Sequence, residues 1–102
     1  MITQEDAIKI AKAFVNECLN KGITFYKVLL FGSYAKNKAE NHSDIDLLLI
    51  SDQFNDNVFD NLKLYAKINI KYPTIETHPY PTYRYDVDDF INEIKKESIP
   101  IV

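Results

Sequence analysis

Two neighbouring stretches, VLLFGSYAKN (residues 28–37) and SDIDLLLI (residues 43–50), decide how this chain folds. Residues 28–31 are a short apolar run with β-branched and aromatic members that ends at Gly32, which is typical of a buried strand. Residues 45–50 have the same apolar character and predict a second strand. The polar segment between the two runs is expected to be a short helix or a loop.

Before these strands, residues 3–22 carry the signals of one amphipathic helix. Thr3 and Asp6 fit a capping box, in which each residue satisfies a backbone N–H group of the other. Gly22 is well placed to end the helix in the left-handed conformation. Apolar residues recur at helical spacing in between, at Ala7, Ile8, Ala11, Phe14, Val15, Cys18 and Leu19.

After the second strand, residues 51–57 form a polar connection and residues 58–68 carry a second helical pattern. Because Pro73 cannot donate to a strand ladder, residues 74–77 are predicted as an edge strand or a strand that begins there. Residues 80–85, rich in Pro and Tyr, are expected to be a loop, and Asp86 to cap a last helix. This order predicts an α/β sandwich with few strands.

The length and composition limit the possible classes of protein. With 102 residues, the chain is expected to form a single domain, 1–102. The net charge of −3 argues against a broad grip on nucleic acid, and no apolar run approaches the ~18 residues of a membrane span. A signal-peptide pattern is absent, and one Cys cannot form an internal disulfide. We therefore expect a cytoplasmic protein with no membrane association and no direct nucleic-acid binding.

Gly32 and Ser33 have the character of a phosphate-binding turn. A glycine directly after a buried strand lets the backbone approach a bulky anion closely. The Ser33 hydroxyl and the free N–H groups at the start of a helix are natural donors to phosphate. This combination favours a nucleotide as ligand.

Acidic residues follow on the next two strands. Asp44 and Asp46 are two positions apart, so on a strand they share one face with Cα atoms roughly 6.5–7 Å apart. Two carboxylates this close repel each other unless a cation lies between them, and oxygen ligands favour Mg²⁺. Glu76 can face this pair if its strand lies beside the second strand. Three carboxylates and a Gly-Ser turn outline a two-metal site for phosphoryl transfer.

The motif Gly32-Ser33-x-Ala35, followed by Ser43-Asp44-Ile45-Asp46-Leu47, resembles the signature of polymerase-β-like nucleotidyltransferases, and the short chain resembles their minimal nucleotidyltransferase group. This resemblance implies a small nucleotidyltransferase fold of the α+β type, with helices packed on a mixed sheet of three or slightly more strands. It further implies that Gly32, Ser33, Lys36 and Ser43 bind the nucleotide. Asp44, Asp46 and Glu76 are then the catalytic residues and the ligands of two Mg²⁺ ions.

The resemblance also implies an activity and a partner. The expected reaction transfers AMP from ATP to a hydroxyl on a partner protein, and the expected partner is a helical HEPN-type toxin, with self-association as another option. The family usually has Arg and Gly where this chain has Lys36 and Asn37, which bears on triphosphate affinity. The alternative is a non-catalytic antitoxin that neutralises its partner by occlusion. A small-molecule transferase is a third, weaker option, because the chain has no second lobe for such an acceptor. The roles of His78 and of the Tyr/Pro-rich segment 72–85 stay open.

Overall fold

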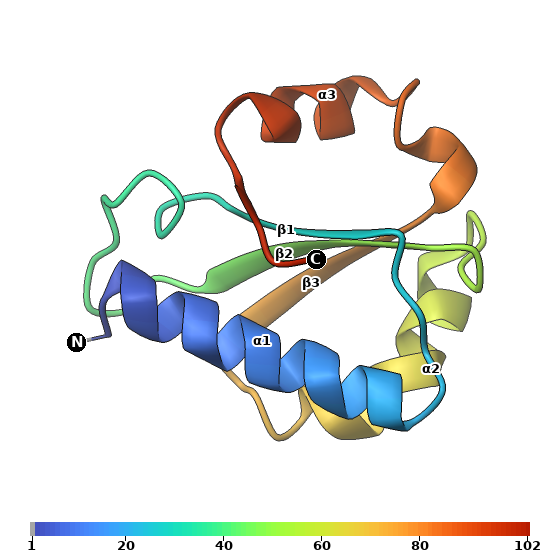
Figure 1. The fold of residues 1–102 in the computed structure, drawn as a ribbon, viewed down its shortest axis with the longest axis horizontal. Coiled ribbons are helices and arrows are strands. Elements are labelled where there is room, and N and C mark those ends of the chain that lie inside the picture. Colours follow the sequence, from blue (N-terminus) through green and yellow to red (C-terminus); the bar gives the residue numbers. More distant parts are fainter. Residues whose placement is uncertain (1) are drawn as a thin grey trace.

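A four-stranded sheet in the order β3-β2-β1-β4 organises the chain, which we describe from a computed structural model of residues 2–102 (Figure 1). β1 pairs antiparallel with β2 and with β4, whereas β2 pairs parallel with β3. The sheet is therefore mixed, as predicted. Its strands are β1 (Lys27–Phe31), β2 (Ile45–Ser51), β3 (Ile75–Pro81) and β4 (Ile99–Pro100).

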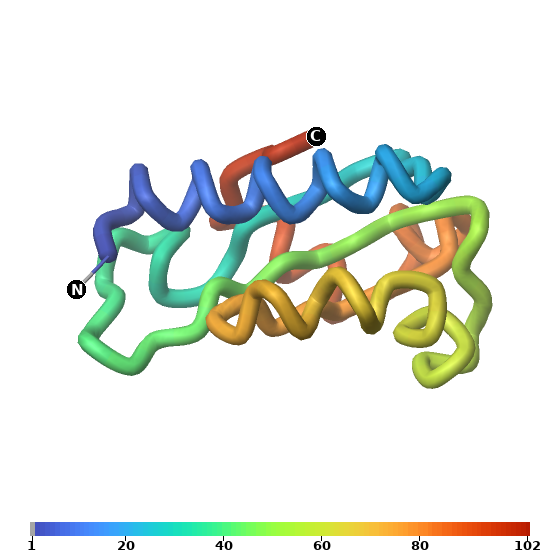
Figure 2. Tube along the Cα trace, turned by 90° about the horizontal axis from the view of Figure 1, so that it is seen from below, coloured from blue at the N-terminus to red at the C-terminus, as the bar shows by residue number. Residues whose placement is uncertain are grey.

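Helices cover both faces of the sheet. They are α1 (Gln4–Asn20), α2 (Val58–Asn69) and α3 (Asp89–Lys96), with a short 3-10 helix, η1 (Thr82–Arg84), before α3. Figures 1 and 2 show α1 and α2 side by side on one face, and Figure 1 shows α3 on the other. Within residues 2–102, no helix combines the length and the apolar character needed to cross a bilayer.

The alternation of side chains along β2 divides the core in two. Ile45, Leu47 and Leu49 are fully buried in the main core under α1 and α2. Leu48 and Ile50 point to the opposite face and pack with Ile91 and Ile94 of α3. Asp46 has the same parity as these residues. It therefore lies on the α3 face.

The ends of α1 follow the sequence signals. The Thr3 hydroxyl accepts the Asp6 N–H at 3.1 Å, and the Asp6 carboxylate accepts the Thr3 N–H at 3.0 Å, which completes the capping box. Gly22 has φ +90°, and the Ile23 N–H donates to the Cys18 carbonyl at 3.0 Å. This is the Schellman arrangement expected of a C-terminal glycine.

The predicted boundaries near the C-terminus are partly wrong. β3 continues to Pro81, past the predicted end at residue 77, because it is an edge strand. The Ile75 N–H donates to Tyr72, away from β2, and Pro79 and Pro81 have the same parity, so their missing N–H groups face the open edge.

The last helix and strand also differ from expectation. Asp88, and not Asp86, caps α3 by accepting the Ile91 N–H at 3.1 Å. Asp86 instead pairs with Lys95 at 3.2 Å. Two residues of β4, which the sequence analysis did not predict, pair with Leu29 and Leu30 of β1.

Candidate functional site

Three strand ends meet at one edge of the sheet. Because β1 and β2 are antiparallel, the last residue of β1, Phe31, pairs with Asp46 near the start of β2. Because β2 and β3 are parallel, Asp46 in turn pairs with Glu76 near the start of β3. The topology thus brings two of the predicted carboxylates side by side on neighbouring strands.

Asp46, Glu76 and His78 form a cluster at this edge. Each offers one potential ligand atom, and the three atoms lie within 4.8 Å of one another. Glu76 and His78 share a face because they are two residues apart on β3. Nε2 of His78 is buried, lies 3.7 Å from Oδ1 of Asp46, and has no hydrogen-bond partner among the residues described. The cluster therefore pairs two oxygen ligands with a free nitrogen.

Gly32 makes room for this cluster. It has φ +76°, a conformation that favours glycine, and a β-carbon built there would overlap Oδ2 of Asp46 and lie 3.3 Å from its Cγ. From the sequence, the absence of a side chain at Gly32 was expected to let a phosphate approach the backbone closely. The structure gives a second reason, which is the position of the Asp46 carboxylate.

After Gly32 the chain makes one hydrogen-bonded turn, so the loop alternative is correct. The Lys36 N–H donates to Gly32 at 3.2 Å, and the Lys38 N–H donates to Ser33 at 2.8 Å. Asn37, with φ +56°, ends the turn in the left-handed conformation, the position where glycine is otherwise favoured. Ser33 is half-buried and Lys36 is exposed.

A cleft of about 380 Å³ lies between this turn and α3. Phe31, Gly32 and Lys36 line one side of the cleft. The α3 side is lined by Phe90, Glu93, Ile94, Lys96 and Glu97. The cleft thus combines apolar side chains with two lysines and two glutamates, so its formal charges balance. Its apolar residues suit a ligand with an aromatic ring.

Asp44 and Ser43 lie outside the three-residue cluster. Asp44 is exposed and directly precedes β2. The Ser43 hydroxyl accepts the Glu40 N–H at 2.8 Å and so holds the turn before Asp44. The side chain that sequence reasoning left without a role is His78. The sequence signal for His78 was its spacing of two residues from Glu76, which places both side chains on one face of a strand.

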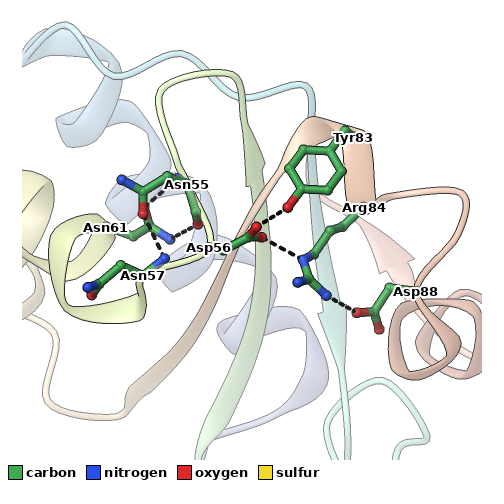
Figure 3. Close-up of polar contacts among 7 residues, drawn as sticks. All are labelled: Asn55, Asp56, Asn57, Asn61, Tyr83, Arg84 and Asp88. Atoms are coloured by element: carbon green, nitrogen blue, oxygen red, sulfur yellow. Dashed lines mark hydrogen bonds and ion pairs between the residues drawn. The ribbon is translucent and has the colours of Figure 1, made fainter.

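A polar network holds the beginning of α3 against the β2–α2 loop (Figure 3). The Tyr83 hydroxyl and Nε of Arg84 both donate to the carboxylate of Asp56, and Nη1 of Arg84 donates to Asp88 at 3.3 Å. The hydrogen bond from Tyr83, followed by that from Arg84, lowers the pKa of Asp56. Since Asp88 caps α3, the network fixes the helix that forms one side of the cleft.

Aromatic rings of the Tyr/Pro-rich segment cover parts of the sheet. Tyr80 packs near Phe90, with ring centroids 6.4 Å apart, and Tyr85 lies under Nζ of Lys95 at 3.8 Å. Tyr72 instead packs on Phe14 in the main core. These three tyrosines therefore have packing roles within the fold.

The model of the nucleotidyltransferase domain family matches residues 11–99. The chain belongs to this family. The match spans both motif stretches and both carboxylate-bearing strands, so the minimal fold expected from the Gly-Ser and Asp-Ile-Asp residues is confirmed. No curated protein sequence matches this nucleotidyltransferase domain.

Two solved structures resemble this nucleotidyltransferase domain. One is a protein from Sulfolobus solfataricus that is provisionally assigned as a nucleotidyltransferase; it has a TM-score of 0.73 and 22% identity, over 95% of this chain and 80% of that one. The other is a toxin-antitoxin complex with AMP-PNP, with a TM-score of 0.61 and 14% identity, over 89% of this chain and 72% of that one. At these identities the likeness shows the fold alone.

A divalent cation fits the residues at the edge of the sheet. Asp46 and Glu76 supply carboxylate oxygens, and the buried nitrogen of His78 lacks any partner within residues 2–102. Asp46 is 23% exposed, so the carboxylate can be reached from solvent. The donor set therefore suits a divalent cation held by two carboxylates and one imidazole.

Proposed function

We propose that this nucleotidyltransferase domain transfers AMP from ATP to a hydroxyl group on a partner protein in the cytoplasm. The observation that carries the proposal is the pairing of Asp46 with Glu76 beside Gly32, at the edge where β1, β2 and β3 meet. Carboxylates at this position, next to a glycine turn, are what phosphoryl transfer between two oxygens requires.

The proposed site contains residues that bind metal and residues that bind the triphosphate. Asp44, Asp46 and Glu76 would hold Mg²⁺, with two ions during the reaction, and bound metal would supply charge neutralisation for the phosphates. Gly32, Ser33, Lys36 and Ser43 hold the triphosphate. The N–H groups of Ser33, Tyr34 and Ala35 donate to no other residue between 2 and 102, so they are available to a phosphate.

The chemical step is an in-line displacement at the α-phosphorus. The acceptor oxygen forms the new P–O bond while the bond to pyrophosphate breaks. Glu76 takes the proton of the acceptor hydroxyl, as its exposed position in the cluster allows. Lys36, at the rim of the cleft, stabilises the charge that develops on the leaving pyrophosphate.

The acceptor is proposed to be a protein of the HEPN type, with this chain as its antitoxin. Two observations support a macromolecular acceptor. The cleft beside Gly32 is small, at about 380 Å³, near the lower end of the roughly 300–1,000 Å³ range of ligand pockets, which leaves little room for a second small molecule. The fold is also shared with a component of a toxin-antitoxin complex that was solved with AMP-PNP.

Labelled ATP tests this function. The chain is incubated with Mg²⁺, ATP labelled in the α-phosphate, and the product of the neighbouring reading frame, and transfer is measured on a gel. We expect label on the partner protein and its loss in Asp46→Asn and Asp44→Asn. Asp52→Asn, an exposed aspartate on the β2–α2 loop, is the matched control and keeps the activity.

A non-catalytic antitoxin predicts a different result. Neutralisation by occlusion survives Asp46→Asn, and no label reaches any acceptor. A melting experiment with the isolated chain separates the two, because a ligand of the native state raises the melting temperature. A flat response to millimolar ATP with Mg²⁺ contradicts the enzyme proposal.

A further inference from the structure

Nε2 of His78 is the unexplained atom of the site. It is buried, and it makes no hydrogen bond to any residue in the described part of the chain. Burying a polar atom without a partner costs free energy, so such an atom calls for a ligand. At 3.7 Å from Oδ1 of Asp46, the nitrogen is too far away for a hydrogen bond and close enough to share an ion with the carboxylate.

Two phenyl rings and two carboxylates lie around the His78 imidazole. The ring lies against Phe31, with centroids 5.1 Å apart, and against Phe90, with centroids 6.2 Å apart. Neither phenyl ring offers an oxygen or nitrogen acceptor. The polar groups that His78 approaches are the carboxylates of Asp46 and Glu76.

The spacing of the three groups suits one ion. Ligand bonds of about 2.1 Å allow two ligand atoms of the same ion to be up to ~4.2 Å apart. The three atoms lie within 4.8 Å, so small side-chain rotations bring them together. His78 and Asp46 have side chains 27% and 23% exposed, so an ion can enter from solvent.

We propose that His78 Nε2 is a direct ligand of the ion held by Asp46 and Glu76, so that the site prefers a first-row transition ion, such as Mn²⁺, to Mg²⁺. The inference rests on the proposed function only in placing a divalent ion at this edge of the sheet. Its physical basis is that imidazole suits transition ions, whereas Mg²⁺ prefers oxygen ligands. His78 thereby determines which metal the site selects.

Mn²⁺ alone, without nucleotide, tests the inference. Electron paramagnetic resonance gives the affinity of the isolated chain for Mn²⁺, and electron spin echo spectra detect a nitrogen bound to the ion. We expect coupling to one imidazole nitrogen in the unmodified chain. His78→Gln is expected to remove this coupling and to weaken Mn²⁺ binding roughly 10- to 100-fold.

Competition with Mg²⁺ measures the preference itself. In His78→Gln, Mg²⁺ displaces Mn²⁺ at a lower concentration than in the unmodified chain, since the oxygen ligands remain. His42→Gln changes the other histidine, which is exposed in the loop before β2, and keeps both affinities. Far-UV circular dichroism confirms that each variant is folded.

Mn²⁺ bound without nitrogen coupling overturns the inference, and so do equal Mn²⁺ affinities in the unmodified chain and His78→Gln. Failure to bind Mn²⁺ at millimolar concentration also overturns it. Failure of the transferase proposal is distinguishable, because it leaves the nitrogen coupling in place while no AMP is transferred.

Discussion

The carboxylate of Asp46 occupies the space that a side chain on Gly32 would need. A β-carbon at Gly32 overlaps Oδ2 of Asp46, and the positive φ of +76° adds backbone strain. The end of β1 and the start of β2 are therefore fitted to each other. The residue at position 32 therefore determines where the carboxylate of Asp46, a candidate metal ligand, can lie.

Gly32→Ala is expected to abolish nucleotidyl transfer and Mn²⁺ binding, because Asp46 must rotate away from the site. The left-handed backbone alone costs about 1–2 kcal/mol of stability for a residue with a β-carbon. Transfer assays, Mn²⁺ titration and urea denaturation of the variant measure the three quantities.

Gly22→Ala is the matched control for this variant. Gly22 also has a positive φ, at +90°, but nothing lies within 4 Å of the position of its β-carbon. The two variants are expected to lose similar stability, and only Gly32→Ala loses function. Equal activity in both variants contradicts the fit between Gly32 and Asp46.

Asn61→Ala is expected to destabilise the β2–α2 connection. The buried amide of Asn61 accepts the Asn55 N–H and donates to the Asn55 carbonyl, each at 2.8 Å. Removing it leaves both backbone groups without that partner, at a cost of about 1–3 kcal/mol. Urea denaturation measures the change. A shift below a few tenths of a kcal/mol shows that water replaces the amide.

Asp56 is expected to make stability depend on acidic pH. Hydrogen bonds from Tyr83 and Arg84 lower the pKa of Asp56 from its ordinary 3.8. A lowered pKa stabilises the folded state above the ordinary value, and this contribution is lost as the pH falls through the folded pKa. Asp56→Asn therefore lowers the melting temperature at pH 7, and the difference from the unmodified chain shrinks below about pH 4.

The effect at neutral pH is expected to be small, because the network is exposed and screened by solvent. Asp52→Asn serves as control, and its melting temperature follows the unmodified chain at every pH. A difference for Asp56→Asn that stays constant down to pH 2 contradicts the assignment.

Cys18 is expected to be inert in the folded protein. It is fully buried on α1, and burial raises the pKa of its thiol to about 12. Since the thiolate is the reactive form, a disulfide reagent at pH 8 reacts only when the chain opens. The labelling rate should therefore follow unfolding and rise with urea. Rapid labelling without denaturant contradicts this expectation.

Much of the fold could be predicted because its signals are local. The Thr3–Asp6 capping box, Gly22 and the apolar runs around Gly32 each act within a few residues, and each reappears in the structure. β4 could not be predicted in this way. Its two residues have no strand pattern of their own, and they pair because β1 offers a free edge.

The candidate site was only partly predictable, because its contacts depend on which strands and helices lie side by side. The pairing of Asp46 with Glu76 depends on β3 lying beside β2, which the sequence analysis stated as a condition. Neither the contact of His78 with Phe31 and Phe90 nor the conflict between Gly32 and Asp46 is visible in the spacing of residues. These contacts arise between strands and helices that are distant along the chain.

The two faces of the sheet hold different kinds of residues. The face under α1 and α2 holds most of the fully buried side chains, whereas the face under α3 holds the carboxylates, His78 and the cleft. Within α3, Ile91 and Ile94 belong to the smaller core, whereas Phe90 and Glu93 are exposed and line the cleft. Substitutions at these two exposed positions are therefore expected to change the cleft at little cost to folding. A library that varies Phe90 and Glu93 could redirect specificity while the larger core keeps the scaffold intact.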